Sequence, residues 1–426
     1  MTVKADAGKS PKNYWLVVAA LSGVPLIMVL GNSMLIPVLP DIREALNLSA
    51  VQVSLIITLF SLPAGLIIPI TGFLSDRYGR KKVIIPALIV YGAGGVIAAL
   101  AAIFLKQNAF SLVLAGRVIQ GIGAAGTAPI AMALCGDLFK DKERSRSLGS
   151  IEASNGLGKV ISPVLGAAIG VLAWYAAFIF FPLIVIPVVI GMWLLVKEPV
   201  GTNKQKLQKY LESFTKIFKQ QKGLLLSSYL AGAIALLVLF GVLFYLSDFL
   251  EQQFGLDGIP KGLVLAIPVL FMSSTSFITG FVIKKKEALM KALVITGLGI
   301  MTASLAFLPL TKNVVPFFTG ISLTGLGAGL ILPCLNMLIT SAASIKERGL
   351  ITSLYGSVRF FGAAAGPPLY GFLMEKGTGL MFWVSAGLAL TSGILFFIFG
   401  KAKGSPPEKN PASFIFKPVP AGKPGR

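Results

Sequence analysis

Apolar residues occur along this chain in long continuous runs separated by short polar segments. Each run has about 20 residues, enough for an α-helix to cross the ~30 Å hydrocarbon core of a bilayer. Only helices and closed barrels satisfy their backbone polar groups in lipid, and runs this continuous are typical of helices. The pattern predicts twelve membrane spans, at residues 14–36, 51–73, 83–104, 111–134, 148–172, 177–196, 224–246, 262–283, 292–309, 316–339, 351–374 and 381–400.

The longest connecting segment, residues 197–223, divides these spans into six plus six. It is rich in Lys and Gln, and its apolar residues are spaced as on one face of an amphipathic surface helix. Those residues are Tyr210, Leu211, Phe214 and Phe218. We therefore expect an all-α membrane protein with two pseudo-symmetric six-helix halves. The expected parts are residues 1–196, a cytoplasmic linker at 197–223, residues 224–400, and a cytoplasmic tail at 401–426.

The composition agrees with a lipid environment, because 55% of the residues are hydrophobic and only 13% are charged, against about 25% charged in a soluble domain. The first apolar run, Tyr14 to Ile36, is longer than a signal-peptide core and is expected to stay as an anchored span. Cys135 and Cys334 lie in or beside spans, so no disulfide framework is expected. The chain has no histidine. This removes the commonest general base and metal ligand, and we expect neither an enzyme nor a metal or cofactor site.

The basic residues indicate the orientation. With a cytoplasmic N-terminus, the inner segments hold 30 Lys or Arg and the outer loops hold five, a strong positive-inside signal. We therefore expect both termini in the cytoplasm and the chain in a bacterial cell membrane. The basic residues are spread over seven inner segments and form no single groove, so the net charge of +21 does not indicate nucleic-acid binding.

The two halves repeat each other at an offset of 204 residues. Spans 4–5 then match spans 10–11 without a gap, including a charged triplet and two prolines. The aligned pairs are Lys142–Arg144 with Lys346–Arg348, Gly116 with Gly320, Gly121 with Gly325, Gly123 with Gly327, Pro129 with Pro333, Gly158 with Gly362, and Pro163 with Pro367. Two parallel six-span halves with a midplane site between them are a known transporter plan.

The most specific motif lies between spans 2 and 3 and reads Gly72-Phe-Leu-Ser-Asp76-Arg77-Tyr-Gly79-Arg80-Lys-Lys. Gly72 allows close helix approach, Gly79 allows a tight turn, and Asp76 can cap a helix or pair with a nearby Arg. The motif resembles the cytoplasmic loop signature of the major facilitator superfamily. The matching loop of the second half, Gly280-Phe-Val followed by Lys284-Lys-Lys-Glu287, lacks the Asp and the second Gly.

Two further motifs resemble signatures of drug:proton antiporters in that superfamily. Span 4 contains the intramembrane Arg117 followed by Gly121-Ile-Gly123, where glycines for helix packing explain the pattern better than a dinucleotide fingerprint. Span 5 contains Ser162-Pro163 and Gly166-Ala167, where the exporter signature has glycines at the first and last of these positions. The second half carries this pattern more fully as Gly362, Gly366 and Pro367.

Few ionisable residues lie within spans, and such residues normally face a cavity or a partner. On span 5 the residues Glu152, Asn155, Lys159, Ser162 and Gly166 are three or four apart and share one face. Arg359 is the repeat counterpart of Asn155, so we expect it to project toward the same cavity from span 11. A plainer alternative for Glu152 is a pair with a loop Arg near the cytoplasmic end.

The resemblance implies a secondary active transporter that exports small amphipathic compounds, with protons as coupling partner, by alternating access of a functional monomer. Relatives often carry an acid in span 1, whereas this chain has Asn32 and Ser33 there. Glu152, Asp137 and Lys159 are therefore the proton-carrying candidates. Because the cavity candidates Arg117, Lys159 and Arg359 outnumber one acid, anionic or zwitterionic substrates are favoured. Export of an anionic metabolite such as a siderophore, facilitated uptake, and a membrane enzyme remain as alternatives.

The topology leads to a first prediction. A cysteine introduced at residue 205 should be labelled only from the cytoplasm, and one at residue 255 only from outside, because the positive-inside rule places them so. A membrane-impermeant thiol reagent applied to intact cells and to inverted vesicles measures this. Labelling of residue 205 in intact cells would contradict the orientation.

Overall fold

A computed structural model of the chain describes residues 13–198, 207–283, 286–311, 313–341 and 348–400. Within these ranges the secondary structure is helical throughout. The first half contains α1 (Tyr14–Ser33), η1 (Ile36–Val38), α2 (Leu39–Ala45), α3 (Ala50–Tyr78), α4 (Arg80–Leu105), η2 (Lys106–Ala109), α5 (Phe110–Ala125), α6 (Ala128–Leu138), α7 (Asp141–Gly170) and α8 (Ala176–Leu195). The second half contains α9 (Leu207–Phe254), α10 (Gly258–Val282), α11 (Glu287–Phe307), η3 (Leu308–Leu310), α12 (Val314–Ser341), α13 (Arg348–Lys376) and α14 (Thr378–Phe399).

A helix lies at each predicted span, with boundaries that differ by a few residues. Span 4 is divided into α5 and α6 at Gly126 and Thr127, and α10 begins at Gly258, so that Lys261 lies inside a helix and not in a loop. The expected linker helix begins at Leu207 and continues into α9 through a kink at Gln221; residues 199–206 lie outside the described part.

Nine helical stretches of the described chain are long and apolar enough to cross a membrane by length and composition. One of them, Arg80–Leu138, holds both α4 and the pair α5–α6. The long helices α7 and α13 fall outside this group, and both carry the charged and polar positions noted above. The count of twelve spans therefore stays a prediction.

The outward-facing residues of the bundle are apolar. Phe104 is 74% exposed, Leu172 80% and Val315 77%, although side chains of this kind are rarely exposed together in a soluble protein. A bilayer around the bundle explains this surface, since lipid tails are as apolar as these side chains.

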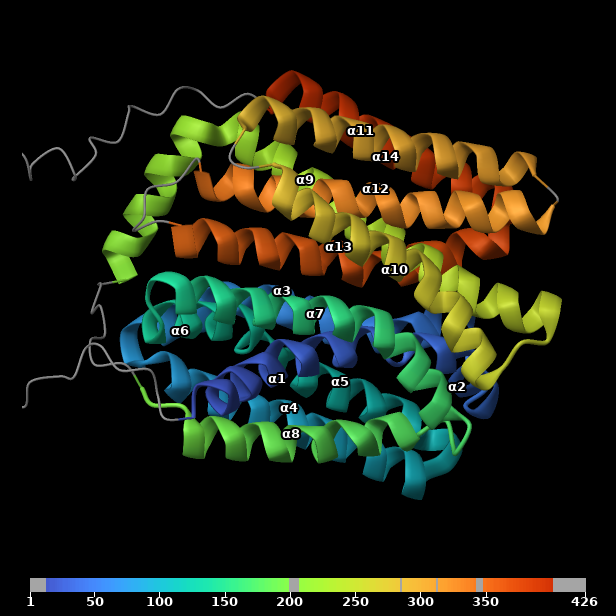
Figure 1. Cartoon of the computed structure of the whole chain (residues 1–426). Helices are drawn as coiled ribbons and strands as arrows, with labels where there is room; N and C mark the ends of the chain where they lie inside the picture. The colour runs from blue at the N-terminus through green and yellow to red at the C-terminus, as the bar shows by residue number, and fades with distance from the viewer. Residues whose placement is uncertain (1–12, 199–206, 284–285, 312, 342–347, 401–426) are drawn as a thin grey trace, which may run out of the picture.

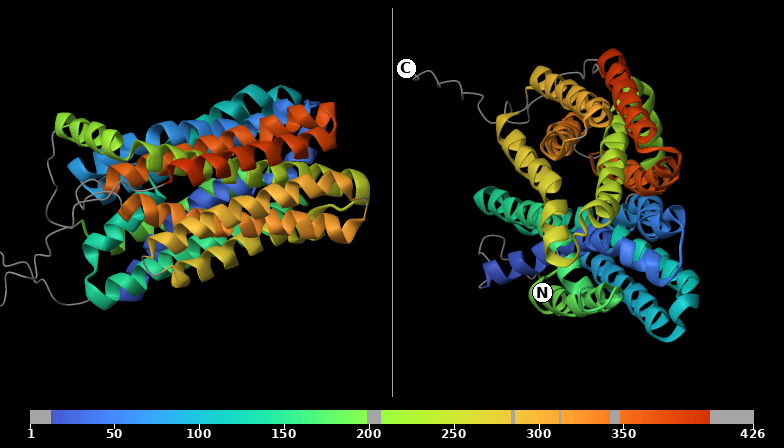
Figure 2. Two further views of the ribbon diagram at one scale, coloured as in Figure 1. Left: turned by 90° about the horizontal axis from the view of Figure 1, so that it is seen from above. Right: turned by 90° about the vertical axis from the view of Figure 1, so that its right-hand side faces the viewer.

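The helices of each half lie together, one half beside the other (Figures 1 and 2). Their long axes run in roughly the same direction. We call the end of the bundle that holds the turn between α3 and α4 the Gly79 end, and the end that holds α2 the Arg43 end. Gly79 has φ +114°, and it is the one residue between α3 and α4, as its place in the loop motif predicts.

The packing of the two halves follows the sequence repeat. In the first half α5 packs on α3 and α4, and in the second half α12 packs on α10 and α11. A Cβ at Gly121 would lie 2.2 Å from the carbonyl oxygen of Phe60 in α3, and one at Gly325 would lie 2.1 Å from that of Pro268 in α10. Residues aligned by the 204-residue offset therefore make equivalent backbone contacts.

The pair α7 on α1 corresponds to the pair α13 on α9, although the glycines at their closest approaches are not aligned by the offset. A Cβ at Gly166 would lie 1.8 Å from the Met34 carbonyl oxygen, and those at Gly362 and Gly366 would lie 2.0 Å and 2.3 Å from the carbonyl oxygens of Ala233 and Leu237. Only glycine permits backbones to approach this closely.

Substitution of these glycines should therefore destabilise the fold. We expect Gly121→Ala and Gly325→Ala each to lower the free energy of unfolding by about 1–3 kcal/mol, because a methyl group would overlap the facing carbonyl. Thermal unfolding in detergent measures the effect. Gly387→Ala is the matched control, since nothing lies within 4 Å of its Cβ position, and alanine there should be neutral or slightly stabilising. Equal melting temperatures for all three variants would refute the close-packing account.

Candidate functional site

Two pairs of long helices pack across the seam between the halves: α3 with α13, and α7 with α10. The Oγ1 of Thr58 in α3 donates a hydrogen bond of 2.7 Å to the carbonyl of Ala364 in α13. Ser357 in α13 donates to the carbonyl of Gly65 in α3. The helices that carry Lys159 and Arg359 are thus both part of the seam between the halves.

The structure brings together three of the charged site candidates. The charges of Arg359 and Glu152 both act on the ammonium group of Lys159, although Arg359 comes from the other half of the chain. Lys159 and Arg359 are half-buried and Glu152 is exposed. None of the three has an ion-pair partner within 4.0 Å among the described residues. The plainer expectation, a pair between Glu152 and a loop Arg, is not seen in this part of the chain.

Polar atoms beside these charges lack hydrogen-bond partners. The Asn155 Oδ1, Ser162 Oγ and Arg359 Nε atoms are buried without a partner among the described residues, and the Arg359 guanidinium lies 5.3 Å from the centroid of the Tyr355 ring. Buried polar groups in proteins are normally paired. Unsatisfied groups from both halves in one region are therefore suited to a polar ligand or to water.

Arg117 lies elsewhere, within the first half. It is 0% exposed, and it donates to the carbonyl oxygens of Ile56 at 2.9 Å and Gly31 at 2.8 Å and to the Gln120 Oε1 at 2.7 Å. Its guanidinium also lies 4.4 Å from the centroid of the Phe60 ring. These contacts tie α5 to α1 and α3. This enclosed position differs from the expected place beside Lys159 and Arg359.

Asn32 is likewise buried between α1 and α3, where its Oδ1 accepts a hydrogen bond of 2.9 Å from Ser61. The polar side chain of span 1 is therefore a buried neutral amide whose oxygen has a hydrogen-bond partner. Among the proton-carrying candidates, Glu152 and Lys159 lie near the seam. Asp137 lies at the Gly79 end, in an ion pair described next.

The loop motif is held by charge contacts within itself and by one with Asp137 of α6. Arg80 Nε lies 2.7 Å from Asp137 Oδ2, and Arg80 Nη2 lies 3.6 Å from Asp76 Oδ1. Arg77 lies over the ring of its neighbour Tyr78, with 5.6 Å from guanidinium to centroid. In the described chain the ion pairs of Asp76 thus stay within one half. Gly72 faces α13 of the other half, and a Cβ added at Gly72 would lie 3.7 Å from the Ser353 Cβ.

Glu198 is a functional residue of this loop that the sequence reasoning missed. Its carboxylate accepts from the backbone N–H of Arg80 at 2.8 Å and of Lys82 at 3.3 Å, so it caps the first turn of α4, where an anion is favoured by the helix dipole. Glu198 is 118 residues away in sequence and follows the end of α8, so no local signal indicated the contact.

Comparisons with known proteins establish the class. The family model of the Major Facilitator Superfamily matches residues 21–367 and 291–422, and the chain belongs to this family of membrane transporters. A protein named Bacillibactin exporter from Bacillus subtilis (strain 168) is 44% identical over 396 residues, which cover 92% of this chain and 98% of that protein. Multidrug efflux protein YfmO from the same organism is 25% identical, over 92% of this chain and 93% of its own.

Solved structures confirm the fold. The D-xylose-proton symporter superimposes with a TM-score of 0.75 at 12% identity, over 91% of this chain and 99% of that one. The human organic anion transporter MFSD10 gives a TM-score of 0.70 at 20% identity, over 89% of this chain and 99% of that one. The predicted all-α fold is thereby confirmed.

The loop geometry generates a prediction. Asp76→Asn should reduce transport strongly while leaving expression near normal, because the neutral amide weakens the contact that positions Arg80 without disturbing the core. Initial transport rates in vesicles, divided by the amount of protein, measure this.

Glu287→Gln is the matched control. Glu287 is also exposed at the start of a helix, and its ion pair is with Lys291 of the same turn. If Asp76→Asn and the control have equal transport rates, the prediction is wrong and the motif serves only as a turn between two helices.

Proposed function

We propose that this chain exports an anionic, metal-chelating metabolite such as a siderophore across the bacterial cell membrane. The observation that carries the proposal is the pair Lys159 and Arg359, which interact across the two halves and lack a carboxylate partner within ion-pair distance in the described chain. An unpaired charge that is partly removed from water is unfavourable, and an anionic ligand between the two cations would offset it.

The comparison with the exporter of bacillibactin supports this substrate class, since that protein is 44% identical over nearly the full length of both chains. The buried acceptor Asn155 Oδ1 and the hydroxyl of Ser162 supply neutral hydrogen-bonding groups beside the cations. A ligand with both negative charge and hydroxyl or amide groups would satisfy the whole set.

The proposed cycle is alternating access of the two halves, with both termini in the cytoplasm and a single chain as the working unit. Proton antiport drives it, and Glu152 is the proposed proton carrier. It is the carboxylate whose charge acts on Lys159, so its protonation would change the electrostatic balance at the anion site.

Export of diverse amphipathic drugs is the second candidate. The relatives named as multidrug efflux proteins favour it, at 24–25% identity. An accumulation assay separates the two candidates. Cells that overexpress the protein are loaded with siderophores, anionic antibiotics or cationic dyes, with and without an uncoupler. Selective, uncoupler-sensitive loss of siderophores from the cells supports the first candidate, and loss of dyes supports the second.

The anion site leads to a mutational prediction. Lys159→Gln and Arg359→Gln should each weaken anion binding by about 1.5–3 kcal/mol, the value of a hydrogen bond to a charged group, which corresponds to roughly 10- to 100-fold. Export of cationic dyes should change little. Substrate-resolved export from vesicles measures both.

Lys106→Gln serves as the control, because Lys106 is an exposed cation in η2 at the Arg43 end. Equal losses for anions and cations in the Lys159 and Arg359 variants would show a structural or coupling role and would refute the anion site.

A further inference from the structure

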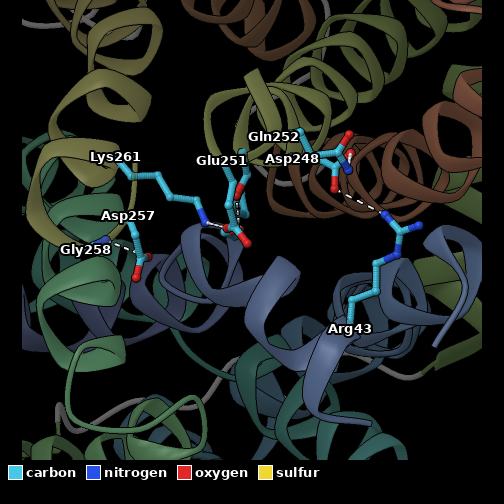
Figure 3. A network of polar contacts seen from close by, with 9 residues as sticks. Arg43, Asp248, Glu251, Gln252, Asp257, Gly258 and Lys261 are labelled. Atoms are coloured by element: carbon cyan, nitrogen blue, oxygen red, sulfur yellow. Dashed lines mark hydrogen bonds and ion pairs between the residues drawn. The ribbon is translucent and has the colours of Figure 1, made fainter. Parts of the chain in front are cut away.

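Charged residues from both halves meet at the Arg43 end (Figure 3). Lys261, in the first turn of α10, is 0% exposed, and its ammonium group pairs with Glu251 of α9. The carboxylate oxygens of Asp41, Glu251 and Asp257 lie within 4.8 Å of one another. Asp41 belongs to α2 in the first half, whereas the other members belong to the second half. One cation is thus enclosed by three carboxylates, one of which comes across the seam.

A second ion pair crosses the seam nearby. The Arg43 Nη1 lies 3.2 Å from the Asp248 Oδ1, and Gln252 donates to the other oxygen of Asp248 at 2.9 Å. Ser247 donates to the carbonyl of Ile36 at 2.9 Å, again across the seam. The space left between α2, α3, α9 and α13 beside Arg43 amounts to about 10 Å³, which is no more than one water requires. The two halves are therefore in close contact beside Arg43.

The charges at this contact explain how the two halves can be held together there and still separate. Three carboxylates this close repel one another, and Lys261 is the cation that offsets them. Separation of the halves would expose all of these groups to water, where their hydration compensates for the lost pairs. Apolar side chains at this contact would gain no hydration energy on separation, which would favour the closed state.

We propose that Lys261, Asp41 and Glu251, together with the Arg43–Asp248 pair, form an electrostatic lock that closes the Arg43 end of the transport pathway and opens in the alternate state. The lock depends on the transporter fold and not on the identity of the substrate. Lys261 is its central element, because without its charge the carboxylates of the two halves repel one another across the seam.

Distances between spin labels test the lock in the full-length protein in lipid nanodiscs, with Cys135→Ala and Cys334→Ala as background. One label pair replaces Gln107 and Gln253, which are exposed on opposite halves at the Arg43 end, and the other replaces Lys140 and Lys286 at the Gly79 end. Lys261→Met should raise the population with a long Gln107–Gln253 distance about tenfold or more, because removal of the ammonium group leaves the facing carboxylates without their cation. Asp41→Asn added to Lys261→Met should lower that population again, because it removes the carboxylate repulsion across the seam. The Lys140–Lys286 distance should shorten in the same population.

Two further variants separate a lock from general damage. Arg43→Asp alone should open the Arg43 end, and the double variant Arg43→Asp with Asp248→Arg should close it again. Lys376→Met is the matched control, since Lys376 is an exposed cation at the same end whose recorded contact is the Phe372 ring of its own helix, and it should leave both distances unchanged.

An unchanged Gln107–Gln253 distance in a folded Lys261→Met protein would overturn the proposal. If Lys261→Met does not fold, the charge swap decides. Failure of the swap to restore the short distance would likewise overturn it. Because these readouts need no substrate, they are independent of the siderophore assay.

Discussion

Helices in a bilayer gain no hydrophobic free energy by packing their apolar side chains together, because the surrounding lipid is equally apolar. They associate through close van der Waals packing instead. In this transporter that packing depends on backbone contact at glycines. Gly121 and Gly325 lie against the carbonyl groups of Phe60 and Pro268, and Gly166 lies against that of Met34. The rest of the structure depends on these approaches, since they set how each half is assembled and which helices remain at the seam.

The polar residues are arranged around this packing in three different ways. Arg117 is enclosed within one half and is satisfied by backbone carbonyls. Lys159 and Arg359 lie on helices at the seam, near enough for their charges to act on each other, without carboxylate partners within ion-pair distance in the described chain. Lys261 and Arg43 are paired with carboxylates at one end. The first arrangement ties helices of one half to each other, the second is the proposed anion site, and the third is the proposed lock between the halves.

Much of this could be predicted from the sequence, because the features that define it are local or repeated. Hydrophobic runs located the helices, helical spacing placed Asn155 and Lys159 on one face, and the 204-residue offset brought Arg359 toward them. The partners of Arg117 could not be predicted, because they are backbone carbonyl groups. Every residue has one, and the sequence does not indicate which of them will face an arginine.

The lock at the Arg43 end was missed for a related reason. Asp41 and Lys261 are about 220 positions apart, and each looks like an ordinary loop charge, so Lys261 was counted among the outer-loop cations. Burial of Lys261 follows from the meeting of α2, α9 and α10, which is a property of the tertiary structure. The contact of Glu198 with the start of α4 has the same origin.

The unpaired cations have a consequence for the energetics of the cycle in a living membrane. A charge that crosses the full membrane field changes in energy by about 2.3 kcal/mol per 100 mV. Lys159 and Arg359 lie in the middle of α7 and α13 and carry positive charge that few nearby carboxylates offset. Any rocking of the halves that shifts them along the membrane normal therefore responds to voltage. A bound anion would reduce the net charge that moves. The conformational equilibria of the loaded and empty carriers would therefore depend differently on the membrane potential.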